Sequence, residues 1–200
     1  MRRRARAGVL AALALLLAPT SAVAGDFWKA FLAGAASGFI VHESAHLTLD
    51  IAFAAQPRLK GVHFGSIPFF AVTHRNGLPE RREAMISGAG FFSQHVWSEV
   101  VLSRQSSSER ISAFSKGALA FHVATSVAYA GAAFSRYGPY ERDTRGIADS
   151  TGSDERLIGT LVLAPAVFDT WRYLRPHSRT AKWGSRLAKI AFVGVIAFKD

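Results

Sequence analysis

Apolar residues gather into five segments along the chain, and polar stretches that contain glycine or proline separate them. The segments cover about residues 27–55, 84–102, 117–134, 156–174 and 186–198. Most are close to the roughly 20 residues that a helix needs to cross a bilayer. All are rich in Ala, Gly and Ser, which let neighbouring helices approach closely. The pattern therefore predicts an all-α fold, a polytopic transmembrane bundle of four or five helices.

A different pattern lies between the first two segments. Residues 61–74 read GVHFGSIPFFAVTH, with short apolar runs on both sides of Gly65 and Pro68. Such runs around a turn are typical of a β-hairpin. Because this stretch is apolar, we expect it to pack at the edge of the membrane.

The N-terminus has the pattern of a targeting segment. Four arginines stand among the first six residues, an apolar run covers 8–18, and Ala22-Val23-Ala24 fits the motif that signal peptidase recognises. We therefore expect residues 1–24 to be a signal peptide or an N-terminal membrane anchor. Residues 25–200 are then one membrane-embedded domain, an ordinary size for a single domain.

The composition and the net charge indicate where the protein is located and which class of partner it binds. Hydrophobic residues make up 50% of the chain, the formal net charge is +10, and there is no cysteine. The basic residues are spread between apolar segments without forming one patch, which favours anionic lipid headgroups over nucleic acid as partners. The prediction is a multi-pass protein of a bacterial inner membrane, with a secreted soluble helical bundle as the alternative.

The candidate chemistry lies in the first apolar segment, at His42-Glu43-Ser44-Ala45-His46. On a helix the residues i and i+4 share a face, so both imidazoles can point at one metal ion. The carboxylate of Glu43 falls beside that face, where it can take a proton from a metal-bound water. The pattern predicts a Zn2+ site with Glu43 as the general base. Without cysteine, any further ligand must be a histidine or a carboxylate.

A catalytic zinc needs a third protein ligand, and the sequence leaves several open. Asp169 lies inside the fourth apolar segment, at a helical depth similar to that of His42. His95 and Glu99 are spaced i, i+4 on the second segment, and pairing within that helix is the alternative for them. Asp149 lies in a polar stretch that resembles a helix-capping turn. A second polar stretch, residues 139–146, carries charges of both signs, which is typical of a solvated, salt-bridged loop, with a substrate or partner contact as the alternative.

The order of these motifs resembles the site-2-protease family of intramembrane zinc metalloproteases. The shared features are the HESAH motif, the hairpin-like stretch 61–74, the small-residue motif Ser87-Gly88-Ala89-Gly90 and the sequence Pro165-Ala166-Val167-Phe168-Asp169. The resemblance implies that His42, His46 and Asp169 are the zinc ligands and that Glu43 is the base. It also implies a membrane-embedded or membrane-adjacent polypeptide as substrate.

The sequence thus predicts an intramembrane zinc metallopeptidase that hydrolyses peptide bonds through a metal-activated water. The alternative is a non-catalytic multi-pass membrane protein that keeps a structural or metal-handling site. Two observations favour this alternative: the chain is small, and Thr170 stands where the family pattern has a glycine.

Overall fold

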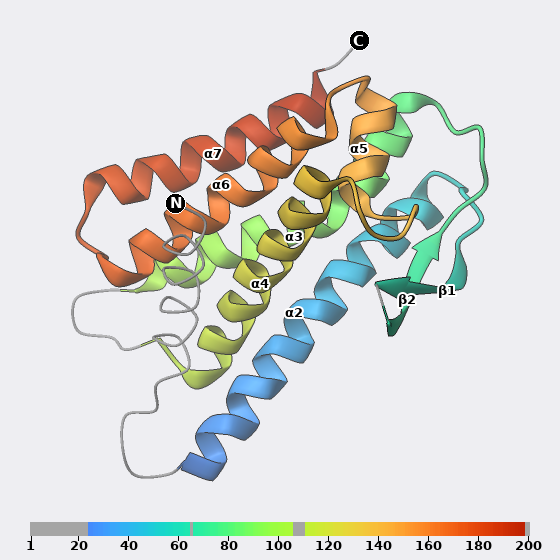
Figure 1. The fold of residues 1–200 in the computed structure, drawn as a ribbon. Helices are drawn as coiled ribbons and strands as arrows, with labels where there is room; N and C mark the ends of the chain where they lie inside the picture. Colours follow the sequence, from blue (N-terminus) through green and yellow to red (C-terminus); the bar gives the residue numbers. More distant parts are fainter. Residues whose placement is uncertain (1–23, 65, 106–110, 199–200) are drawn as a thin grey trace.

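The computed structural model describes residues 24–64, 66–105 and 111–198. This part of the chain forms helices and one small antiparallel sheet (Figure 1). The elements are α2 (Ala24–Ala52), β1 (Arg58–Phe64), β2 (Ile67–Thr73), α3 (Glu80–Arg104), α4 (Ala113–Ser135), α5 (Asp143–Thr151), α6 (Glu155–Leu174) and α7 (Arg179–Ala197). The signal segment predicted for residues 1–24 lies almost wholly outside the described residues and stays a prediction.

Small residues set the closest helix contact, between α2 and α4. Gly34 on α2 faces the backbone of Phe114, and Gly117 on α4 faces the backbone of Phe31. A Cβ atom at either glycine would collide with the facing helix, so only glycine permits this approach. The contact fixes α2, which carries the HESAH motif, against the helix that lines the other side of the candidate site.

The predicted hairpin is confirmed. Strands β1 and β2 pair antiparallel, with Arg58 opposite Thr73 and Gly61 opposite Phe70. The hairpin follows α2, which ends at Ala52 because the chain turns through left-handed conformations at Ala54 and Gln56. Figure 1 shows it beside the second half of α2.

The main apolar core lies between α3, α5, α6 and α7. It consists of the buried side chains Phe91, Ile147, Ala148, Ile158, Val162 and Phe192. The ring of Phe91 also packs edge-on against His42, with 5.6 Å between ring centroids. The core therefore supports the candidate site directly.

One helix was not expected. The prediction of a solvated loop over residues 139–146 is wrong in its second half, because α5 begins at Asp143. This helix is amphipathic: Thr144, Ile147 and Ala148 are buried, whereas Asp149 is exposed. Nine residues with a single buried face give little signal beside the longer apolar segments.

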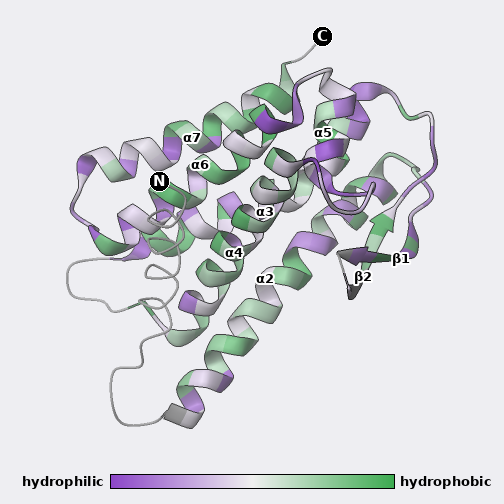
Figure 2. Ribbon diagram, viewed as in Figure 1, coloured by the Kyte–Doolittle hydropathy of each residue, from purple (hydrophilic) through white to green (hydrophobic). Residues whose placement is uncertain are grey.

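The helical fold is confirmed, but a polytopic transmembrane bundle is not supported. Within the described residues, only α4 is long and apolar enough to cross a membrane, and 56% of its most apolar window is buried inside the protein. A core helix of a soluble protein has the same properties, so this is weak support for a membrane span. The other long helices also contain charged residues, for example Asp50 on α2 and Lys189 on α7, and Figure 2 shows hydrophilic positions among the hydrophobic ones.

Candidate metal centre

The two histidines of the HESAH motif lie one helical turn apart on α2 and turn their rings toward each other. Their Nε2 atoms are 3.2 Å apart. Both side chains are buried, with exposed fractions of 2% for His42 and 6% for His46. Two imidazole nitrogens this close, away from water, need a group between them or beside them that both can bind.

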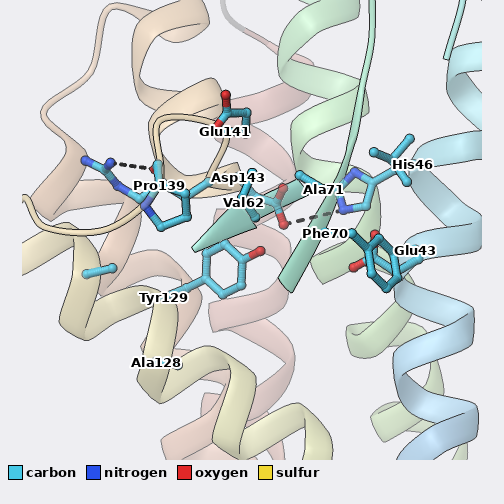
Figure 3. A pocket seen from close by; sticks show the side chains of 13 residues that line it. Glu43, His46, Val62, Phe70, Ala71, Ala128, Tyr129, Pro139, Glu141 and Asp143 are labelled. Atoms are coloured by element: carbon cyan, nitrogen blue, oxygen red, sulfur yellow. Dashed lines mark hydrogen bonds and ion pairs between the residues drawn. The ribbon is translucent and has the colours of Figure 1, made fainter. Parts of the chain in front are cut away.

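Asp143, in the first turn of α5, supplies that group. Its Oδ2 atom lies 3.1 Å from Nε2 of His42 and 3.4 Å from Nε2 of His46. Figure 3 shows Asp143 and His46 facing each other across the site. His42, His46 and Asp143 thus form a group that could hold a metal ion.

The orientation of His46 is fixed from α3. Its Nδ1 atom lies 2.7 Å from the backbone carbonyl oxygen of Ile86. A carbonyl oxygen can only accept a hydrogen bond, so Nδ1 carries the proton and donates it. When His46 is neutral, the lone pair of Nε2 therefore faces His42 and Asp143, which is the tautomer that a metal ion needs.

The small-residue motif on α3 makes room for His42. A Cβ atom at Gly90 would overlap the imidazole ring of His42. The ring of the neighbouring Phe91 also packs edge-on against the His42 ring. The glycine at position 90 is therefore a requirement of the site, since any larger residue would displace a candidate ligand.

Asp143 is held in place by a buried ion pair. Nε and Nη2 of Arg142 each donate to one carboxylate oxygen of Glu155, both at 2.6 Å. The hydroxyl of Thr144 donates to the same carboxylate at 3.0 Å. These contacts tie the start of α5 to the start of α6, and Asp143 lies between the two anchored residues.

The pKa values of His42, His46 and Asp143 depend on one another because the three side chains are buried together. Burial lowers the pKa of His42, although the nearby Asp143 carboxylate opposes this. Burial would also lower the pKa of His46, but the carboxylates of Asp143 and Glu43 raise it to about 9. Burial would raise the pKa of Asp143, yet the two imidazoles hold it below its ordinary value. Without an ion, protonated His46 therefore balances the Asp143 carboxylate.

Glu43 lies beside the group without belonging to it. Together with His46 and Asp143 it lines a cavity bounded by the hairpin and α4 (Figure 3). Burial and the Asp143 charge raise the pKa of Glu43 to about 7, with His46 acting in the opposite direction. A carboxyl group that titrates near neutrality is suited to accept and return a proton.

Asp169, predicted as the third ligand, lies elsewhere. Its carboxylate accepts a hydrogen bond of 2.5 Å from Ser185 and lies 3.0 Å from the ammonium group of Lys189. Its other oxygen is 3.3 Å from Nε2 of His122. The group that the structure brings together therefore has Asp143 where the sequence analysis expected Asp169.

The other three candidates for the third metal ligand also lie away from His42 and His46. The ring of His95 packs edge-on against those of His122 and Phe192. Glu99 pairs with Arg172, Arg186 and Lys189. Asp149 is exposed and lies 3.4 Å from Arg145, one turn earlier on α5. None of these described side chains is in the group around His42.

Asp143 was not predicted as a ligand because the residues around it have the pattern of an exposed loop. Glu141, Arg142 and Arg145 surround it with charges of both signs, which is typical of an exposed loop. Only the buried positions of α5, Thr144, Ile147 and Ala148, could have indicated a helix that turns Asp143 inward.

Comparison with known proteins gives no match: no family model, no curated protein and no solved structure matches this chain. The resemblance to the site-2-protease family therefore stays a prediction based on the motifs. The fold and the site together define a mainly helical protein with a buried His–His–Asp group that could hold a metal ion.

Proposed function

We propose that the protein is a zinc-dependent peptidase in which His42, His46 and Asp143 bind the ion and Glu43 is the general base. The observation that carries this proposal is the spacing of the three ligand atoms, which are 3.2, 3.1 and 3.4 Å apart. Tetrahedral zinc with bonds of about 2.0–2.1 Å to nitrogen and oxygen requires ligand atoms about 3.3–3.4 Å apart. The three atoms therefore fit one face of such a tetrahedron.

The donor set supports zinc as the ion. Two neutral imidazoles and one carboxylate are a common set for catalytic zinc, and they leave the fourth position for water. The hydrogen bond from His46 to the Ile86 carbonyl is the kind of outer contact that orients a zinc ligand. Magnesium and calcium instead prefer ligand sets made of oxygen atoms.

The reaction would divide its tasks among neighbouring side chains. A bound zinc ion supplies a Lewis acid that lowers the pKa of water toward neutrality and polarises a carbonyl group. Glu43 accepts a proton from the attacking water and returns it to the leaving amine, a role that a pKa of about 7 suits. The phenol side chain of Tyr129 extends toward Asp143 on the far side of the cavity (Figure 3).

A membrane-associated polypeptide is the proposed substrate class. Large apolar side chains are exposed along several helices, among them Leu32, Ile40 and Ile51 on α2 and Trp183, Leu187 and Ile190 on α7. Exposed apolar residues in such numbers, with a net charge of +10, suit a protein that works at an anionic lipid surface.

A comparison of two variants tests the proposal against a non-catalytic metal protein. The purified protein should contain one zinc ion per chain, and His46→Ala should remove it. Glu43→Gln should keep the zinc yet lose cleavage of a quenched-fluorescence library of random peptides. Cleavage by Glu43→Gln at the wild-type rate would contradict the assigned base, and zinc binding without cleavage by the wild type would favour the non-catalytic alternative.

A further inference from the structure

A cavity of about 230 Å³ opens directly beside the metal group. Glu43, His46 and Asp143 are among the residues that line it (Figure 3). The rest of the lining comes mainly from the hairpin, the C-terminal half of α4 and residues 139–142. A molecule that enters this cavity therefore comes within reach of the base and of two of the three metal-binding side chains.

Most of the remaining lining of the cavity is apolar. It consists of Val62, Phe70, Ala71 and Val72 from the hairpin, Ala128 and Ala132 from α4, and Pro139, with the phenol group of Tyr129 as a polar addition. Burial of an apolar group against such a lining is favourable, since it removes that group from water. The lining thus selects for a hydrocarbon side chain close to the reacting atoms.

Two charged residues at the cavity are bound by partners outside it, and the other three belong to the proposed reaction site. Glu141 accepts a hydrogen bond of 2.6 Å from Lys60, and Arg142 is bound by Glu155. Glu43, His46 and Asp143 belong to the proposed reaction site. Among the described side chains that line the cavity, none is therefore left to neutralise a charged substrate side chain, and burying an uncompensated charge is strongly unfavourable.

The size of the cavity indicates what enters it. An enclosed space of about 150 Å³ is enough to hold benzene. Pockets that enclose a whole small-molecule ligand are larger, about 300–1,000 Å³. A volume of 230 Å³ therefore suits a single large apolar side chain, such as that of leucine or phenylalanine.

We propose that this cavity is the specificity pocket of the enzyme and binds an uncharged apolar side chain next to the bond that is cleaved. The inference rests on the proposed function, because it needs the scissile carbonyl at the metal group. It adds a substrate class to that function: peptides with a leucine- or phenylalanine-like residue at the cleavage point, in preference to a charged one.

Three hydroxamates test the pocket separately from the metal. A hydroxamate group binds zinc, so acetohydroxamate reports on the metal alone. The leucine-like 4-methylpentanehydroxamate adds an apolar side chain, and 6-aminohexanehydroxamate adds a charged one. With the zinc-loaded full-length protein in titration calorimetry, we expect the leucine-like compound to bind about tenfold more tightly than acetohydroxamate or better. The amino compound should show no gain.

Two matched variants of α4 test whether the tighter binding of the leucine-like compound comes from this cavity. Ala128 lines the cavity and is exposed, so Ala128→Phe should fill the cavity without disturbing the core. Ala124 is also exposed, one turn earlier on the same helix, and does not line the cavity. Ala128→Phe should abolish the tenfold gain and leave acetohydroxamate binding unchanged, whereas Ala124→Phe should keep both. On the hairpin, Ala71→Phe should repeat the effect of Ala128→Phe.

The outcomes separate the two proposals. If acetohydroxamate does not bind, the zinc site fails, and the pocket assignment fails with it. If acetohydroxamate binds but the leucine-like compound gains nothing, only the pocket assignment is overturned. A gain that persists equally in Ala128→Phe and Ala71→Phe overturns it as well, because the side chain then binds elsewhere.

Discussion

At the scale of single residues, the candidate site depends on a glycine that contributes no ligand. Gly90 lies against the imidazole ring of His42, and a Cβ atom there would overlap the ring. Gly90→Ala should therefore destabilise the protein by about 1–3 kcal/mol, as overpacking of a filled interior does, and should weaken zinc binding. Thermal unfolding and competition with a zinc chelator measure the two effects.

Gly131 on α4 is the matched control for this prediction. It also lies within a helix, but no atom lies close to where its Cβ would be. Gly131→Ala should leave zinc binding unchanged and stabilise the helix by about 0.5–1 kcal/mol. If Gly90→Ala binds zinc like the wild type, the ring of His42 does not need this space and its assignment as a ligand is weakened.

A second residue-scale prediction concerns the proton on His46. Its pKa of about 9 means that most molecules without metal carry this proton at pH 7. A zinc ion must displace it, so binding at pH 7 should release about one proton, and fewer as the pH rises through 9. Calorimetry in buffers of different ionisation enthalpy measures this number. A binding enthalpy that is the same in every buffer at pH 7 would show that His46 was already neutral.

At the scale of secondary-structure elements, α5 is the part that completes the site. The helix is short, and its N-terminus is held by the buried ion pair between Arg142 and Glu155. Removing one member of a buried pair leaves the other charge uncompensated. Arg142→Gln should therefore lower stability by about 3 kcal/mol or more and weaken zinc binding by releasing Asp143.

The comparison variant is Arg145→Gln on the same helix. Arg145 pairs with Asp149, and both side chains are substantially exposed, so the loss should be within about 1 kcal/mol. Denaturant unfolding with and without zinc distinguishes the two variants. Equal effects of both on zinc affinity would mean that the anchor at Glu155 does not position Asp143.

The elements also differ in how far the sequence could predict them. The long helices and the hairpin follow from local patterns, and the spacing of His42 and His46 on one helix face is local as well. Asp143 is 97 residues beyond His46, which follows from their numbers. Its approach depends on the anchoring of α5 against α6, a long-range contact that local periodicity does not contain. Asp169 looked equally suitable because it also lies on an apolar helix, but that helix turns it toward His122.

At the scale of the whole molecule, the surface combines exposed apolar side chains with a large positive charge. Among the described helices, only α4 has the hydropathy of a membrane span, because the other apolar segments contain buried polar or charged residues such as Asp50 on α2, Asp169 on α6 and Lys189 on α7. We expect the purified protein to bind vesicles that contain phosphatidylglycerol more strongly than vesicles of phosphatidylcholine, with the difference reduced by salt. A flotation assay measures this, and equal binding to both vesicles in low salt would contradict an electrostatic contribution.

The central claim is that Asp143, and not Asp169, completes a zinc site with His42 and His46. Zinc content per chain in the Asp143→Asn and Asp169→Asn variants, measured on folded and purified protein, tests this claim most directly. We predict that Asp143→Asn loses zinc binding, whereas Asp169→Asn keeps one zinc ion even if its stability falls. Zinc retained in Asp143→Asn and lost in Asp169→Asn would contradict the account.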